Sequence, residues 1–101
     1  MIEKKQRERD IERRVKEYGR KTGWFVSKWS SPALRGVPDD IFIKNGRVIF
    51  IEFKATGKKP TKLQAAMHKK MEAAGAKVYV IDSVMEGKLL LDFWSDEVKQ
   101  C

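Results

Sequence analysis

The chain has 101 residues, of which 42% are hydrophobic, and this is enough for one folded domain, residues 1–101, with a modest core. Its net charge of +8 at neutral pH favours polyanionic partners, most often nucleic acid, but does not by itself identify a function. The single cysteine, Cys101, excludes an intramolecular disulfide, and no apolar run approaches the ~18 residues of a membrane helix. We therefore expect no membrane association, no visible secretion signal and a cytoplasmic location, in a bacterial or phage-infected host cell.

Residues 2–21 are predicted to form a helix with one narrow apolar stripe. The apolar residues are spaced i, i+4 and i+7, at Ile11, Val15 and Tyr18. Glu8 and Glu12 lie on one flank of this stripe. These acids either form ion pairs with basic neighbours on the helix, or one of them contributes to an acidic site on an adjacent element.

Gly23 is predicted to end this helix, and residues 24–29, with three aromatic side chains, are typical of a strand. Lys28 on this strand is either an ordinary strand-edge lysine or a contact for a phosphate group. Residues 30–38 are predicted to form a loop because they are rich in Ser, Pro and Gly. Arg35 in this loop is a further candidate phosphate contact, although surface arginines are common.

The most informative stretch is residues 39–54, which consists of two apolar runs separated by Asn-Gly. Asn-Gly is the strongest short-range signal for a hairpin with a type I′ turn, since that turn needs positive φ at both central residues. Counting outward from the turn places Asp39 opposite Glu52, with their Cβ atoms roughly 4.5–5.5 Å apart. Lys54 points to the same side of the sheet, whereas Asp40 points to the other side.

This register brings two carboxylates and one lysine together at the open end of an otherwise apolar hairpin. Two carboxylates at that distance repel each other unless a proton or a cation lies between them. A divalent metal ion bound between Asp39 and Glu52 is the simplest such cation.

Residues 54–70 contain six lysines and no acid. Such a run is usually a solvated surface, but its position next to the candidate metal site favours a phosphate backbone as its partner. The exposed candidates for that contact are Lys58, Lys59 and Lys62.

A second helix is predicted to begin within this basic run, with Thr61 and Gln64 forming a capping box. Gln64 is either only a capping residue or also part of the site. The apolar positions continue at Leu63, Met67, Met71 and Ala74 before Gly75 ends the helix. His68 has no second histidine or cysteine with which to share a metal, so we assign it to the helix surface.

Residues 77–82 are predicted to form a strand parallel to the second strand of the hairpin, because a helix separates the two. A final helix is expected from Ser83 to about Lys99, with Ser83 and Glu86 as a second capping box. This helix would bury Val84, Leu91, Trp94 and Val98. The element order predicts an α/β fold: an αβββαβα core, three-layered in outline, whose mixed four-stranded sheet is flanked by helices.

The motifs of the chain also resemble a known family. Pro38-Asp39, followed by Glu52-Phe53-Lys54, matches the Pro-Asp and Glu-x-Lys signature of the PD-(D/E)XK nucleases, whose fold is restriction-endonuclease-like. The wider series resembles the VRR-NUC branch, especially its small stand-alone members in phages. That series comprises Gly36-Val37-Pro38-Asp39, Ile51-Glu52-Phe53-Lys54, Gly57-Lys58-Lys59-Pro60 and Leu63-Gln64.

The resemblance implies that Asp39, Glu52 and the backbone carbonyl of Phe53 hold Mg²⁺ or Mn²⁺. It further implies that Lys54 orients the attacking water and stabilises the charge that develops on the phosphate. Gln64 matches a family glutamine near the site, and an acid on the first helix belongs to the family pattern. We assign that acid to Glu12 in preference to Glu8. The residue after Pro-Asp is often basic in relatives but is Asp40 here.

Stand-alone members of the branch are similar to Holliday-junction resolvases, so the resemblance implies a homodimeric, metal-dependent endodeoxyribonuclease that cuts branched or four-way DNA. Two alternatives remain. The first is a nicking or flap-type DNA nuclease, and the second is a basic nucleic-acid-binding module without catalysis. The pair of acids argues against the module, since phosphate binding gains nothing from adjacent carboxylates.

Overall fold

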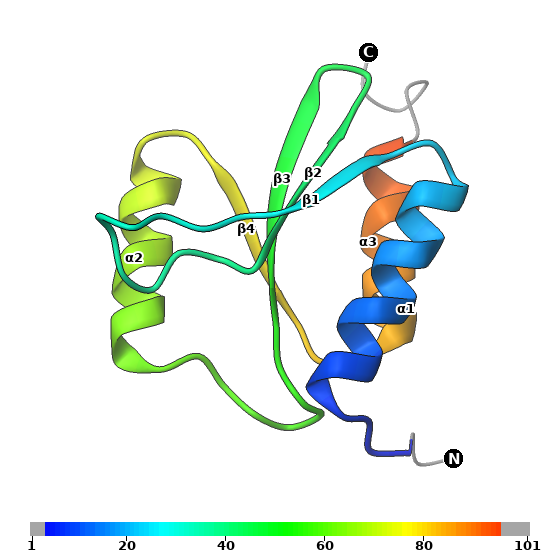
Figure 1. Ribbon diagram of the computed structural model, residues 1–101, viewed down its shortest axis with the longest axis horizontal. Coiled ribbons are helices and arrows are strands. Elements are labelled where there is room, and N and C mark those ends of the chain that lie inside the picture. Colours follow the sequence, from blue (N-terminus) through cyan, green and yellow to red (C-terminus); the bar gives the residue numbers. More distant parts are fainter. Residues whose placement is uncertain (1–3, 96–101) are drawn as a thin grey trace.

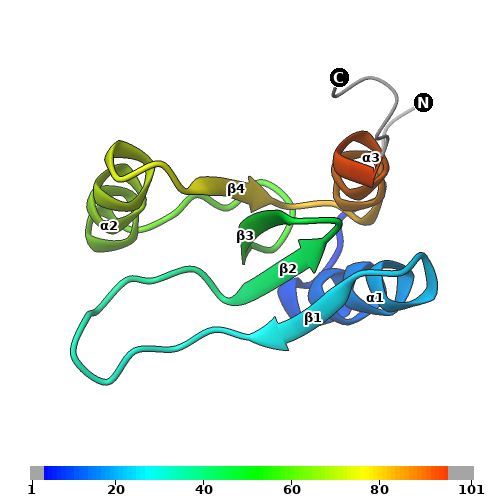
Figure 2. The same ribbon diagram turned by 90° about the horizontal axis from the view of Figure 1, so that it is seen from above.

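A computed structural model describes residues 4–95 of the chain, and its elements follow the expected order. They are α1 (Glu8–Lys21), β1 (Phe25–Lys28), β2 (Asp40–Lys44), β3 (Arg47–Phe53), α2 (Lys62–Ala73), β4 (Lys77–Ile81) and α3 (Val84–Ser95). The strands form one sheet in the order β1-β2-β3-β4, antiparallel except for the parallel β3–β4 pair. Helices α1 and α3 lie together beside one part of the sheet, and α2 lies apart from them beyond β4 (Figures 1 and 2). The predicted fold class is confirmed.

The hairpin has the predicted register. Lys44 pairs with Arg47 and Ile43 with Val48 across the turn, and the ladder continues to Asp40 and Ile51. Asn45 and Gly46 have φ values of 52° and 79°, the left-handed conformation that a type I′ turn requires.

One helix boundary differs from the prediction, and the predicted end of the last helix near Lys99 lies outside the described residues. Helix α1 begins at Glu8, because the backbone of Gln6 just before it is held by Thr56 in the loop after β3: Gln6 N donates to Thr56 Oγ1 at 2.9 Å, and Thr56 N donates to Gln6 O at 3.0 Å. Arg7 is accordingly extended. At the other end α3 is described as far as Ser95, so the predicted contribution of Val98 lies outside the described residues.

The core lies between the sheet and the α1–α3 pair. Because side chains alternate along a strand, Ile49, Ile51 and Phe53 of β3 face these helices and are fully buried. Glu52, between Ile51 and Phe53, therefore points to the opposite face. Ile11 and Val15, from the predicted stripe of α1, complete the core from the helix side.

Helix α2 buries a different face from the one that its apolar pattern predicts. Met67 is buried, but Leu63 is 49% exposed and Ala74 is also exposed, whereas His68 is only 7% exposed. The assignment of His68 to the helix surface was wrong. It rested on metal-ligand counting, which does not reveal that the helix turns this side chain towards the sheet.

Two glycines allow α1 to approach its neighbours closely. A Cβ atom at Gly87 of α3 would lie 2.5 Å from Val15 Cγ2, closer than packed carbons can approach. A Cβ atom at Gly19 of α1 would lie 3.2–3.3 Å from Phe42, Leu91 and Val26. Gly87 is therefore retained inside a helix, where glycine is intrinsically unfavourable.

Gly87→Ala is expected to destabilise the fold by about 1–3 kcal/mol through overpacking, despite the roughly 1 kcal/mol that alanine contributes as a better helix former. Combining it with Val15→Ala should recover part of this loss, because the second change removes the methyl groups that clash. A double-mutant cycle by urea denaturation measures the coupling. Additive effects of the two substitutions would contradict this packing.

Candidate active site

The open end of the β2–β3 hairpin holds Asp39 directly before the first residue of β2. The backbone carbonyl of Asp39 accepts from Trp29 N at 2.8 Å, and its carboxylate Oδ2 accepts from Phe53 N at 2.7 Å. Pro38, which is buried and has no N–H, precedes it. The carboxylate is thus held by the backbone of the strand that carries Glu52, as the predicted register requires.

Glu52 is 2% exposed, and three side chains surround its carboxylate. Gln64 Nε2 donates to Oε2 at 3.1 Å, and Lys54 Nζ lies 3.6 Å from the same oxygen. His68 Nε2 lies 3.7 Å from Oε1. The site therefore contains the predicted Lys54 and Gln64, together with a histidine that the sequence reasoning missed. Its position four residues after Gln64 is the signal that could have revealed it, since i and i+4 share a helix face.

Gln64 performs both of the roles that the sequence left open. Its Oε1 accepts from Thr61 N at 2.9 Å and Thr61 Oγ1 accepts from Gln64 N, which completes the capping box. Its Nε2 remains free of the cap and donates to Glu52. The start of α2 is thereby coupled to the site.

The loop before Asp39 packs against the same helix turn. Gly36 has φ +84°, and a Cβ atom there would lie 2.9 Å from the backbone oxygen of Leu63, next to Gln64. A side chain would be both strained and in collision at this point. The Gly-Val-Pro-Asp and Leu-Gln motifs are thus in direct contact in the fold.

Burial raises the proton affinity of both acids, and the charge of Asp39 raises that of Glu52 further. Burial, followed by the charge of Asp39, raises the pKa of Glu52 to about 7, and Lys54 offsets only part of this. Burial also raises the pKa of Asp39, against the hydrogen bond from Phe53 N. Burial lowers the pKa of His68, so its ring is mainly neutral at neutral pH. The state in which Asp39 and Glu52 are both ionised is therefore unfavourable in the absence of a cation. Such strongly shifted pKa values are typical of functional sites.

Asp40 lies on the other side of the sheet, against α1. It is fully buried, and Lys16 Nζ lies 3.1 Å from its Oδ1. Burial and the neighbouring Glu12 raise the pKa of Asp40 to about 7. The sequence separates Asp40 from the site correctly, but its partner Lys16 was missed because the two residues meet only in the tertiary structure.

Glu12 makes its direct contacts on this side of the sheet, in a charged cluster with Lys16, Lys28 and Asp40. Its Oε2 lies 2.9 Å from Lys28 Nζ and 3.8 Å from Lys16 Nζ, the latter an i,i+4 pair. Its charge also acts on Asp39, whereas the charge of Glu8 acts on Glu52. Each of these two acids therefore acts on one member of the pair through its charge, and among residues 4–95 neither forms a hydrogen bond or an ion pair with Asp39 or Glu52.

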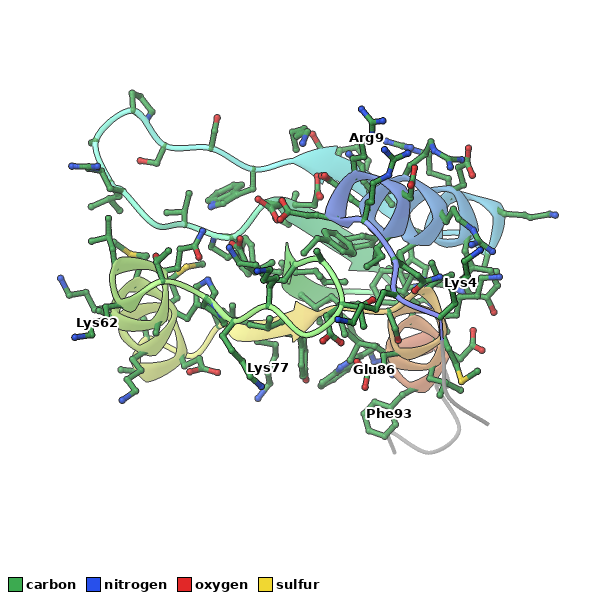
Figure 3. The ribbon with its side chains drawn as sticks, turned by 90° about the horizontal axis from the view of Figure 1, so that it is seen from below. Lys4, Arg9, Lys62, Lys77, Glu86 and Phe93 are labelled. Carbon is green, nitrogen blue, oxygen red and sulfur yellow. The ribbon has the colours of Figure 1, made fainter. Side chains whose placement is uncertain are left out.

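The candidate DNA contacts are solvent-exposed. Lys28 has a side chain that is 71% exposed although it is paired with Glu12. The other four are also exposed: Arg35, Lys58, Lys59 and Lys62. Lys62 points outward from α2 (Figure 3). The loop that carries Lys58 is tied down by two hydrogen bonds of 2.9 Å, from Thr56 Oγ1 to Asp82 O and from Gly57 N to Asp82 Oδ2.

A basic groove along α1 adds cations that the sequence analysis did not single out. Its lining residues are Arg9, Glu12, Arg13, Lys16, Glu17, Arg20 and Lys28. Arg9 projects away from α1 towards solvent (Figure 3). Three of its lining residues, Glu12, Lys16 and Lys28, belong to the charged cluster around Asp40, so the groove lies on the α1 side of the sheet.

The donor set of the site suits a hard divalent cation. Within residues 4–95, no group of three or more His, Cys, Asp and Glu side chains is arranged to hold a metal ion. An ion here would therefore rely on two carboxylates, a backbone carbonyl and water, which is how proteins commonly bind Mg²⁺. The buried Oε1 of Glu52 has no hydrogen-bond partner and is available as a ligand.

Comparisons with known proteins indicate a nuclease. The chain is 44% identical over 78 residues to "Putative nuclease p44" of Acyrthosiphon pisum secondary endosymbiont phage 1, an alignment that covers 76% of this chain and 84% of that protein. A solved structure described as a VRR_NUC domain superposes with a TM-score of 0.78 at 27% identity, covering 86% of this chain and 96% of that one. No family model matches the chain.

The fold and these two relatives place the chain among the nucleases with a restriction-endonuclease-like fold. Within that class, the chain belongs to the VRR-NUC family, and its phage relative agrees with the predicted resemblance. Among the described helices, none is long and apolar enough to cross a membrane.

The raised pKa of Glu52 gives a stability test. Its folded value of about 7 lies above the ~4.3 of an unfolded glutamate, so its contribution to stability falls as pH rises from about 4 through 7. Glu52→Gln cannot ionise. In the absence of metal, the melting temperature of Glu52→Gln minus that of the wild type should therefore be several degrees larger at pH 8 than at pH 5. Circular dichroism measures both melting temperatures.

Phe50→Leu on the same strand is the control for this measurement. It introduces no titratable group and leaves Glu52 in place, so its melting temperature should keep a constant offset from that of the wild type. A constant offset for Glu52→Gln as well would show that Glu52 has no raised pKa in the folded chain.

Proposed function

We propose that the protein is a Mg²⁺- or Mn²⁺-dependent endonuclease that hydrolyses DNA phosphodiester bonds. The observation that carries the proposal is the buried carboxylate Glu52, held next to Asp39 and contacted by Lys54. A non-catalytic binding module would have no use for this arrangement, since buried like charges destabilise a fold and repel phosphate.

Each residue has a specific role in the proposed chemistry. Asp39, Glu52 and the Phe53 carbonyl would hold the metal ion, which when bound lowers the pKa of a water molecule and polarises the phosphate. Lys54, whose side chain is 14% exposed, orients the attacking water and stabilises the charge that develops on the phosphate oxygens. Gln64 fixes the carboxylate of Glu52, and Glu12 is the α1 acid whose charge reaches Asp39.

DNA binding is proposed to follow the exposed cations around this site. Lys58 and Lys59 lie in the anchored loop directly after Lys54, and Lys62 begins α2. Arg35 lies in the loop that contacts α2, and Lys28 lies beyond Asp39 on β1. These positive charges would neutralise phosphates on both sides of the scissile bond.

Wild-type protein is expected to cut DNA in Mg²⁺ or Mn²⁺ and not in a chelator. Asp39→Asn and Glu52→Gln should each reduce the rate by about 10³-fold or more, because a metal ion contributes several kcal/mol of transition-state stabilisation. Lys54→Ala should reduce the cleavage rate by about 10²–10³-fold, which is typical of removing one preorganised electrostatic group. Lys77→Ala, at an exposed lysine that starts β4, should leave the rate unchanged.

The assay compares labelled four-way junction, flap and linear duplex DNA. Preferred cutting of the junction supports resolvase activity, whereas preferred cutting of the flap or a nick in duplex supports the alternative nuclease types. No cleavage of any substrate in either metal would contradict the nuclease proposal and leave the binding module.

We also propose that the enzyme is a homodimer, which suits paired cuts in a four-way junction. An apolar stripe on α3 supports self-association, because Met85, Leu89 and Phe93 are spaced i, i+4 and i+8 and are 58–63% exposed. Such a stripe can pack against its own copy across a two-fold axis.

Leu89→Asp is expected to convert a particle of twice 11.7 kDa into a monomer in sedimentation equilibrium, since it places a charge in the middle of the stripe. Phe25→Asp, at an equally exposed residue of β1, is the matched control and should remain dimeric. A monomeric wild type would contradict the dimer, and dissociation by Phe25→Asp alone would place the interface on the sheet.

A further inference from the structure

His68 and Glu52 each present an unpartnered buried atom to the other. Within residues 4–95, Glu52 Oε1 and His68 Nε2 are two of the five buried side-chain atoms without a hydrogen-bond partner. They lie 3.7 Å apart, and the residues are 2% and 7% exposed. A buried polar atom without a partner destabilises a fold, so two such atoms that face each other indicate a functional role.

Helix α2 directs two side chains at the same carboxylate. Gln64 and His68 are one turn apart and therefore lie on one helix face. Gln64 Nε2 already donates to Oε2 at 3.1 Å, so the other oxygen, Oε1, is the one that faces His68. An imidazole can donate from Nε2, and a carboxylate oxygen that accepts one such bond keeps a lone pair for a metal ion.

We propose that His68 is a positioning residue for the metal-binding carboxylate: with Gln64 it forms a two-point clamp on Glu52, with Nε2–H closing onto Oε1. The inference rests on the proposed metal dependence and extends it to a residue that has no part in the Asp, Glu-x-Lys signature. A clamp on both oxygens fixes the plane of the carboxylate and hence the direction in which Oε1 meets the ion.

The clamp explains why a histidine occupies a buried position of α2, on a face that the apolar pattern of this helix does not predict to be buried. Met67, its neighbour, is buried through packing. His68 presents a ring N–H to Oε1 of Glu52, the carboxylate oxygen that Gln64 does not contact. Partners that orient a metal ligand in this way typically affect metal affinity by 10–100-fold when they are removed.

The experiment measures Mn²⁺ binding to the full-length chain by the electron paramagnetic resonance signal of free Mn²⁺. Wild-type protein is expected to bind one ion per chain. His68→Leu, which lacks the N–H, should bind about 10–100-fold more weakly, whereas His68→Gln, which keeps a donor of similar reach, should bind within about threefold of the wild type. Met67→Ala should lower the melting temperature without changing the affinity, which separates positioning from general packing.

His68→Asn keeps a polar side chain that is too short to reach Oε1, so it should weaken binding like His68→Leu and tests the proposal even if the leucine variant does not fold. Wild-type affinity in His68→Asn or His68→Leu would overturn the clamp while leaving metal dependence intact. Equal weakening in His68→Gln and His68→Leu would overturn the role of the donor. Absence of Mn²⁺ binding by the wild type would overturn both this inference and the proposed function.

Discussion

The repulsion between Asp39 and Glu52 is the interaction on which the rest of the site depends. The register of the β2–β3 hairpin places both acids at one end of the sheet, and burial removes the water that would screen them. The surrounding elements supply partial compensation: a backbone N–H from Phe53 to Asp39, an ammonium from Lys54 and an amide from Gln64 to Glu52. The remaining repulsion is what makes the site suited to a divalent cation.

The fold joins distant motifs around this pair. Gly36 allows the loop before Asp39 to reach the first turn of α2, and the capping box fixes Gln64 in that turn. Hydrogen bonds between Gln6 and Thr56 hold the basic loop after Lys54 against the start of α1. The scaffold therefore holds both the acids and the loop that carries the neighbouring cations, so that little ordering of the site would be needed to bind the proposed DNA substrate.

The parts of this arrangement that depend on local rules were predictable from the sequence. Asn45-Gly46 sets the register, so the pairing of Asp39 with Glu52 and the separation of Asp40 follow by counting. The Thr61–Gln64 capping box is likewise a short-range pattern. The burial of His68 depends on which face α2 turns to the sheet, and the weak apolar pattern of that helix does not encode it. The Lys16–Asp40 ion pair forms only where α1 packs against β2, and no short-range pattern in either segment encodes this pairing.

The central claim is that Asp39 and Glu52 bind a divalent metal ion, and anomalous diffraction from crystals grown with Mn²⁺ tests it most directly. The account predicts one anomalous peak per chain, about 2.0–2.4 Å from an oxygen of each carboxylate and from the Phe53 carbonyl. Absence of a peak at this position, or a peak at the Glu12–Asp40 cluster on the opposite face instead, would contradict it.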